Sequence, residues 1–281
     1  MERLGRVLRR PRPSTAGLAR TAVSMPTFTH GFVREVSRSL ARCELTHVAR
    51  GEFDIAEARR QHAAYVAALT AAGVKVNVLP EVADLPDSTF VEDPVVLLDE
   101  IAIVARPGAA SRRAEVEAMR REIAPLRPLV AIEAPGTLEG GDVLRVGRVL
   151  YVGRSSRTNR AGIEQLAGSV AAHGYRVVPV EVAGCLHLKT GATSPGEGLL
   201  LANPDWVDVR AFANLEILPV TKHEPWGANT LPVNGRVLAA QSSPATADLL
   251  EARGLDVVRL DVSELQKAEA GLTCLSVLYT G

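Results

Sequence analysis

The stretch Gly147-Arg-Val-Leu-Tyr-Val-Gly153 decides the fold, because its pattern returns later in the same chain. It is followed by the polar residues 155–159, an apolar-periodic stretch, Gly174 and a run rich in β-branched residues. The same order recurs from Gly235-Arg-Val-Leu-Ala-Ala240 through a second helical stretch to Gly254. The chain therefore repeats a unit that reads strand, helix cap, helix, glycine stop and strand.

Local signals mark the ends of the expected helices. Ser243 is expected to cap a helix that has Pro244 at its first position. Gly174 and Gly254 are expected to take the left-handed conformation after the last turn. In the first unit, Asp54 with Glu57 three residues later predicts a capped helix over residues 55–72.

The chain accommodates about five such units. Further helices are expected over residues 111–123 and, more weakly, near residues 204–212. A repeat of roughly 40 to 50 residues is typical of radial or solenoidal folds, and closing the ring would place the last strand, residues 274–279, beside the first segments. A doubly wound sheet is the alternative, but the glycine-rich phosphate turn expected after its first strand is not visible.

Composition limits the function classes. The 281 residues contain 32 basic and 32 acidic side chains, so no net field attracts nucleic acid or an anionic membrane. We expect a small-molecule partner, and a homodimer is left open. Three cysteines without a ligand-like spacing indicate a reducing cytoplasm. Residues 1–24 are expected to be a disordered basic tail or an upstream extension, and residues 25–281 a single catalytic domain.

Three residues form a minimal set for covalent catalysis: Cys274, His187 and Glu139. A thiolate nucleophile needs a partner that handles protons, and a carboxylate can fix the tautomer of that partner. Taken singly, each residue also has a purely structural interpretation. Cys274 could be a small buried apolar residue, His187 a hydrogen-bonded core histidine, and Glu139 an acid in a turn.

An acidic segment, Pro86-Asp-Ser-Thr-Phe-Val-Glu-Asp-Pro94, contains candidate ligands for a cation. If Ser88 to Asp93 is extended, Phe90 and Glu92 share one face and Asp93 lies on the other, with Asp87 at the entrance. Carboxylates so grouped can pair with a planar guanidinium while Phe90 offers an apolar wall. A solvated acidic loop and a divalent-metal site are the alternatives.

Arg112 and Arg157 occupy equivalent places in two units, after a strand and near a helix start. Together they could clamp a carboxylate, although surface arginines at such junctions are common. The acidic side chains could bind the cationic end of a ligand and the arginines its carboxylate. This combination predicts a site for a cationic amino acid.

The chain resembles the dimethylarginine dimethylaminohydrolases of the guanidino-group-modifying superfamily, over about residues 30–279. The resemblance rests on six motifs in the family's order: Pro86-Asp-x-x-Phe-Val-Glu-Asp93, Arg106-Pro-Gly-Ala-x-Ser-Arg-Arg113, Glu139-Gly-Gly-Asp142, Arg157-Thr-Asn159, Leu186-His-Leu-Lys-Thr190 and Thr273-Cys-x-Ser276. It implies an α/β fold, a five-bladed α/β propeller of ββαβ units.

The resemblance also implies roles for single residues. Cys274 would be the nucleophile, His187 the general acid and base, and Glu139 the carboxylate that orients it. The substrate contacts would be Asp93 and Glu92 beside the guanidinium with Phe90 as a wall, Asp87 with main-chain carbonyls near Leu45 and Ala268 at the α-amino group, and Arg112 with Arg157 at the α-carboxylate.

The implied activity is hydrolysis of Nω-methylated arginine to citrulline and an alkylamine, through a thiouronium on Cys274, without cofactor or metal. A hydrolase of the arginine deiminase type, acting on arginine or agmatine and releasing ammonia, is one alternative. An amidinotransferase, in which an amine replaces water, is another. A methylarginine or zinc sensor that uses Cys274 and His187 is the non-enzymatic alternative.

Overall fold

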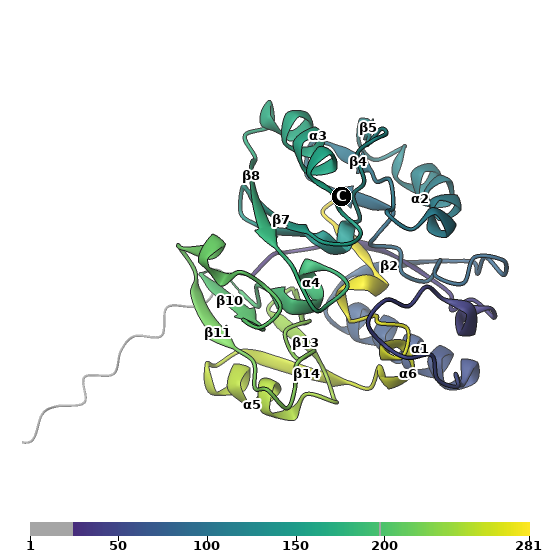
Figure 1. Ribbon diagram of the computed structural model, residues 1–281. Helices are drawn as coiled ribbons and strands as arrows, with labels where there is room; N and C mark the ends of the chain where they lie inside the picture. Colours follow the sequence, from purple (N-terminus) through teal and green to yellow (C-terminus); the bar gives the residue numbers. More distant parts are fainter. Residues whose placement is uncertain (1–24, 197) are drawn as a thin grey trace, which may run out of the picture.

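Five small sheets surround a common centre in the computed structural model, which describes residues 25–196 and 198–281. In Figure 1 the chain passes from the teal sheets at the top through the green sheets to the yellow-green sheet at the bottom. Each sheet has three strands, as the repeat predicts. The expected five-bladed α/β propeller is confirmed.

Every sheet has the same connectivity. Its middle strand pairs antiparallel with one neighbour and parallel with the strand that follows the helical segment of the unit. Four of the sheets are formed by β3 (Val95–Leu97), β4 (Ala102–Val104) and β5 (Leu129–Ala131); β6 (Val143–Val146), β7 (Val149–Arg154) and β8 (Arg176–Glu181); β9 (Ala192–Thr193), β10 (Leu199–Ala202) and β11 (Glu216–Pro219); and β12 (Leu231–Val233), β13 (Arg236–Ala240) and β14 (Asp256–Leu260).

The fifth sheet closes the ring with both ends of the described chain. β1 (His30–Arg34) pairs parallel with β2 (Lys75–Leu79) and antiparallel with the last strand, β15 (Val277–Tyr279), so that His30 lies opposite Tyr279. The prediction that the C-terminal strand pairs with an early segment is confirmed. This closure brings the segment before β15, which contains Cys274, back to the centre of the molecule (Figure 1).

Helices connect the strands on the outside of the ring, and their ends agree closely with the sequence signals. They are α1 (Ile55–Ala71), α2 (Glu115–Ile123), α3 (Arg160–Ala171) and α5 (Pro244–Ala252). The short α4 (Leu188–Gly191) lies instead at the centre (Figure 1), and the short α6 (Ser263–Gln266) packs against α1. The segment before α2 forms a 3₁₀ helix (Ala110–Ala114), and the weak fourth unit forms only the 3₁₀ helix Val209–Phe212.

Four predicted cap residues can be compared with the structure. Asp54 accepts a hydrogen bond from the Glu57 amide at 2.9 Å, and Gly174 and Gly254 have φ of 76° and 82°. Ser243 occupies the N-cap position before Pro244, as predicted, but its side chain makes no capping hydrogen bond. The amides at the start of α5 instead donate to the carboxylate of Glu224, a distant residue that no local signal identifies.

The apolar cores lie between the helices and the sheets, while the centre of the ring is polar. Beside the sheet of β6, β7 and β8, Leu150 on β7 packs with Leu166 and Val170 on α3, and all three are fully buried. Burying each such side chain contributes roughly 1.5 to 3 kcal/mol. The cluster that contains Leu150 also includes Ile103 of β4, so apolar contacts join neighbouring blades around the polar centre.

Residues 88–93 are not extended, so the predicted alternation of side chains is wrong. Consecutive turns occupy this segment, with the Phe90 amide donating to the Asp87 carbonyl and the Asp93 amide to the Phe90 carbonyl. The turns bring Phe90, Glu92 and Asp93 into the interior on a compact loop, a conformation that period-two reasoning does not describe.

No helix of the described residues is long and apolar enough to cross a bilayer. The predicted tail, residues 1–24, lies outside the described residues.

Candidate active site

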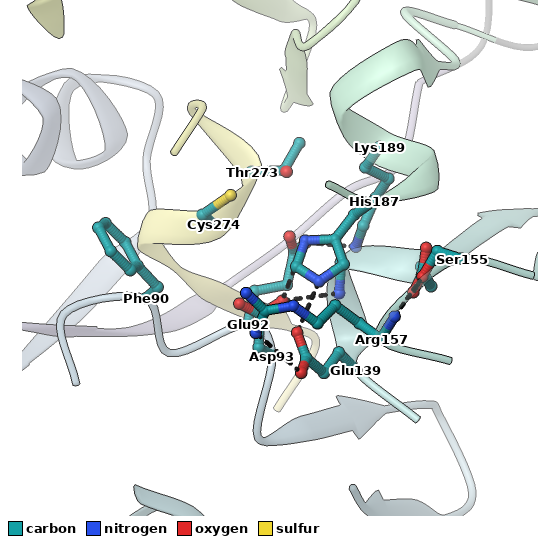
Figure 2. Close-up of polar contacts among 12 residues, drawn as sticks. Phe90, Glu92, Asp93, Glu139, Ser155, Arg157, His187, Lys189, Thr273 and Cys274 are labelled. Atoms are coloured by element: carbon teal, nitrogen blue, oxygen red, sulfur yellow. Dashed lines mark hydrogen bonds and ion pairs between the residues drawn. The ribbon is translucent and has the colours of Figure 1, made fainter. Parts of the chain in front are cut away.

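The three candidate catalytic residues come from three different blades and meet at the centre. Cys274 lies on the 3₁₀ helix Thr273–Leu275, His187 directly precedes α4, and Glu139 directly precedes the 3₁₀ helix Gly140–Asp142. Figure 2 shows the Cys274 sulfur directed toward the side on which the His187 ring lies, with Glu139 beyond that ring. Closure of the ring thus gathers residues that are 48 and 87 positions apart along the chain.

The imidazole of His187 is fixed by a carboxylate on each side. Its Nε2 lies 2.6 Å from Glu139 Oε2, and its Nδ1 lies 3.9 Å from Asp93 Oδ1. Gly141 packs directly against this arrangement, because a Cβ there would lie 2.6 Å from His187 Nδ1 and 2.7 Å from Asp93 Oδ1. The glycine in Glu139-Gly-Gly-Asp142 is therefore needed for space.

Charge around His187 favours its protonated form. Burial of the imidazole opposes protonation, but the charges of Asp93 and Asp142 and the hydrogen bond to Glu139 outweigh it and raise the pKa of His187 to about 9. The imidazolium is then the resting form at neutral pH, ready to donate a proton.

Cys274 is buried and protonated in the free protein. Burial and the negative charges of Glu92 and Asp93 raise the pKa of its thiol to about 12, against the opposing effects of the Gly271 amide and Lys189. The Gly271 N–H lies 3.4 Å from the sulfur and donates to it. Nucleophilic attack therefore requires a change that stabilises the thiolate.

The two adjacent acids have different partners. Asp93 accepts from the Arg112 guanidinium at 2.6 Å and from the Gly141 amide at 3.0 Å. Its burial disfavours the charge, but His187 and Arg112 outweigh this effect and lower its pKa to about 2. Glu92 instead pairs with the ammonium of Lys189, and its burial raises its pKa. The structure thus leaves Asp93 ionised and gives Glu92 its own counter-ion.

The two candidate arginines are both buried at the centre but are held differently. Arg112 is bound between Asp93 and Glu115, with its Nη2 2.8 Å from Glu115 Oε2. Arg157 donates from Nη2 to Thr46 Oγ1 at 3.1 Å, and its Nη1 lies 3.6 Å from Glu139 Oε1. Within the described residues Nη1 of Arg157 has no hydrogen-bond partner, so Arg157 has a donor available for a ligand.

A central cavity joins these groups. It is lined by Glu44, Asp87, Phe90, Asp93, Arg112, Arg157, Leu186, His187, Ala268, Glu269, Ala270 and Cys274. Eight of these are predicted site residues. Of the other predicted residues, Glu139 lies behind His187, Glu92 is turned to Lys189, and Leu45 packs against the apolar cluster that contains Phe90 and Cys274.

Glu269 is a cavity residue that sequence reasoning missed. Its carboxylate accepts from the backbone amides of Thr46 at 2.8 Å and Val48 at 2.6 Å, and also from that of His47. Its own backbone is left-handed, with φ of 59°. The carboxylate thereby fastens the 44–48 segment beside the cavity. A contact across 221 to 223 residues leaves no local signal.

Among the residues that the structure describes, one group of side chains has the spacing to hold a metal ion. Asp93, Glu139 and His187 present ligand atoms within 4.8 Å of one another. Glu139 is already bonded to His187, and Asp93 is already paired with Arg112. The positive charge of Arg112 would repel a metal ion at this position. This internal pairing disfavours a metal ion at this position.

Comparison with known proteins agrees with this geometry. The family model for eukaryotic N,N-dimethylarginine dimethylhydrolase matches residues 47–201. The N(G),N(G)-dimethylarginine dimethylaminohydrolase of Pseudomonas aeruginosa is 37% identical over 90% of this chain and 100% of its own length. That of Streptomyces coelicolor is 42% identical over 87% of this chain and 95% of its own length. The chain belongs to the dimethylarginine dimethylaminohydrolase family.

Solved structures of dimethylarginine dimethylaminohydrolases share the fold throughout. A mutant of the Pseudomonas aeruginosa enzyme in complex with citrulline superimposes with a TM-score of 0.84 at 36% identity, covering 90% of this chain and 100% of that one. A second such structure, an adduct with S-methyl-L-thiocitrulline, gives a TM-score of 0.85 with the same identity and coverage. The dimethylarginine dimethylaminohydrolase resemblance predicted from six motifs is confirmed.

Proposed function

We propose that this chain hydrolyses Nω-methylated arginine to citrulline and an alkylamine, with Cys274 as the nucleophile. One observation carries the proposal: the buried thiol opens on the same cavity as the His187 imidazole and the Asp93 carboxylate, with Glu139 behind the imidazole. The citrulline complex of a family member supports the same product here.

The chemistry proceeds in two halves. The Cys274 thiolate adds to the guanidinium carbon and forms a C–S bond, and the tetrahedral adduct expels the methylated nitrogen as that nitrogen takes a proton from His187. The product of this half is a thiouronium on Cys274. A water molecule then loses a proton to the neutral His187 and adds to the same carbon. The C–S bond breaks, the proton of the added hydroxyl group passes to the departing sulfur, and citrulline and the Cys274 thiol are released.

Thiolate formation is coupled to substrate binding. In the free protein Glu92 and Asp93 oppose ionisation of Cys274. A guanidinium cation beside these carboxylates offsets their charge and lowers the pKa of the thiol. The thiol loses its proton to solvent when the cation to be attacked has arrived, because His187 is already protonated. The empty enzyme therefore carries little reactive thiolate.

The remaining cavity residues suit the amino-acid end of the substrate. Asp87 and Arg157 both line the cavity, and Nη1 of the buried Arg157 has no hydrogen-bond partner among the described residues. The substrate α-carboxylate would bind the guanidinium of Arg157, and the α-ammonium would lie near the carboxylate of Asp87. Each charged group then has a partner of opposite charge. Agmatine lacks the carboxylate, so it leaves Arg157 unused.

Offering asymmetric dimethylarginine, arginine and agmatine side by side, and identifying the amine released, tests the reaction and its substrate. We expect dimethylamine and citrulline from the first, with Cys274→Ser inactive as the matched control. Ammonia from arginine at a higher kcat/KM would assign the chain to arginine hydrolysis instead. Guanidinoacetate formed when glycine is added would identify amidino transfer.

We further propose that the enzyme acts in the cytoplasm and as a homodimer. Three buried cysteines without a disulfide support a reducing compartment. Cell fractionation and light scattering of the purified chain measure the two properties, and an exported or monomeric enzyme would contradict them.

A further inference from the structure

Asn229 has a buried side chain whose amide bridges two separate segments at the centre. It lies between β11 and β12 and is 6% exposed. Its Nδ2 donates to the Lys189 carbonyl at 2.8 Å and to Thr273 Oγ1 at 3.1 Å, and its Oδ1 accepts from the Thr273 amide at 3.3 Å. One side chain therefore makes three hydrogen bonds to partners 40 and 44 residues away.

The bridged segments carry the two reacting groups. Thr273 is next to Cys274, and Lys189 follows His187 by two residues on α4. Thr273 and Lys189 both appear beside the catalytic groups in Figure 2. Because a buried amide with all its partners is costly to displace, these bonds hold the nucleophile segment against the histidine segment.

Gly271 contacts both the side-chain amide of Asn229 and the sulfur of Cys274. A Cβ at Gly271 would lie 2.3 Å from both Cγ and Oδ1 of Asn229, so the two residues are in direct contact. The φ of Gly271 is outside the left-handed region, so its glycine is required for space. The N–H of Gly271 is the donor to Cys274 Sγ.

We propose that Asn229 is a positioning residue for the reaction: it fixes Cys274 relative to His187 by bonding the segment of each and by packing against the glycine whose amide contacts the sulfur. This inference rests on the proposed use of Cys274 and His187. Asn229 is not among the described residues that line the central cavity, so it acts through others and does not touch substrate.

Asn229 also holds the groups that favour the thiolate. Burial and the charges of Glu92 and Asp93 raise the pKa of Cys274, whereas the Gly271 amide and Lys189 lower it. His187 lines the same cavity as the sulfur. Asn229 contacts the backbone of Lys189 and packs on Gly271. Releasing both groups therefore reduces the thiolate population.

The test compares Asn229→Ala with Asn203→Ala. Asn203 is equally buried at 6%, donates to the Pro225 carbonyl at 3.1 Å and accepts from the Asp205 amide at 3.0 Å. Both variants lose a bonded buried amide, so the unfolding temperatures of both should fall. Only Asn229→Ala should lower kcat, by about tenfold or more at little cost in KM, because misplacing reacting groups costs rate.

A second variant covers the case in which Asn229→Ala does not fold. Gly271→Ala forces a methyl against the Asn229 amide and should give the same loss of kcat. Combined with Asn229→Ala, the methyl meets no amide, so the double variant should lose no more than the worse single variant. Additive losses, or a kcat for Asn229→Ala within about twofold of that for Asn203→Ala, overturn the proposal.

A readout without substrate separates this inference from the proposed function. At an alkaline pH below the thiol midpoint, the ultraviolet absorbance of the Cys274 thiolate should fall several-fold in Asn229→Ala and stay unchanged in Asn203→Ala. Cys274→Ser in each background supplies the baseline. Absence of methylarginine turnover in the wild type defeats the proposed function alone, and an unchanged thiolate signal in Asn229→Ala defeats the positioning role alone.

Discussion

Arg112 Nη1 lies 2.6 Å from Asp93 Oδ2, so a predicted carboxylate ligand and a predicted guanidinium ligand of the substrate are bound to each other. Glu115 holds the other edge of the Arg112 guanidinium at 2.8 Å. Arg112 is thus largely satisfied within the protein, whereas Arg157 has an open donor. The two arginines, equivalent in the repeat, therefore should respond differently to mutation.

Arg157→Ala should raise KM for the methylated substrate with a smaller effect on stability. The side chain is 7% exposed, and removing one partner of a buried charged contact costs about 2 to 5 kcal/mol of binding. Arg160→Ala is the surface control, because Arg160 is 84% exposed and pairs with Glu164 on the outside of the molecule. Steady-state kinetics of both variants give the comparison, and a KM for Arg157→Ala equal to that of the control would show that Arg157 does not contact substrate.

Arg112→Ala should instead destabilise the fold. It leaves Asp93 and Glu115 buried without their cation, and breaking a buried pair from one side costs about 3 to 5 kcal/mol. Burial has already raised the pKa of Glu115 to about 7 even beside Arg112. Urea unfolding measures the loss. An unchanged midpoint would mean that the pairing contributes nothing to folding.

Glu139→Gln should move the alkaline limb of the kcat profile to lower pH. Burial opposes the charge on His187, and the hydrogen bond to Glu139 is one of the effects that raise its pKa to about 9. Removing an anion from beside a cation lowers the pKa of the cation, so the proton donor is lost at a lower pH. Asp99→Asn, at the surface, is the control. An alkaline limb that stays in place would exclude His187 as the group that titrates there.

The ring, its repeat and most element ends could be predicted from sequence because they depend on local patterns. The apolar runs, the Asp54 cap and the positive-φ glycines each act within a few residues. The turns over residues 88–93 could not be predicted from local patterns. The buried acids in this segment take their hydrogen-bond partners from other blades, and period-two alternation does not contain such contacts.

The composition of the site was predicted better than its pairing. Eight predicted residues line the cavity, and the Glu139 to His187 contact agrees with its expected role. Which acidic side chain pairs with which basic one depends on differences of a few ångströms in the folded structure. The spacing of residues along the chain does not determine these distances. Lys189 belongs to the motif Leu186-His-Leu-Lys-Thr190, but its pairing with Glu92 follows only from the fold.

Glu269→Gln should release the 44–48 segment and weaken substrate binding. The three amides of Thr46, His47 and Val48 converge on one carboxylate, and a neutral amide replaces a charged acceptor and turns one oxygen into a donor. Because Thr46 also receives the Arg157 guanidinium, loosening this segment disturbs the proposed carboxylate site. We expect faster hydrogen exchange at residues 46–48 and a higher KM.

Glu224→Gln is the matched control for this change. Glu224 likewise accepts from consecutive backbone amides, those of Ala245 and Thr246, each at 2.7 Å, but at the start of α5 and outside the cavity. Both variants lose a similar charged cap, worth about 0.5 to 2 kcal/mol. Only Glu269→Gln should change KM. Equal KM values in the two variants, with exchange at residues 46–48 accelerated, would show that the segment is fastened for stability and takes no part in holding substrate.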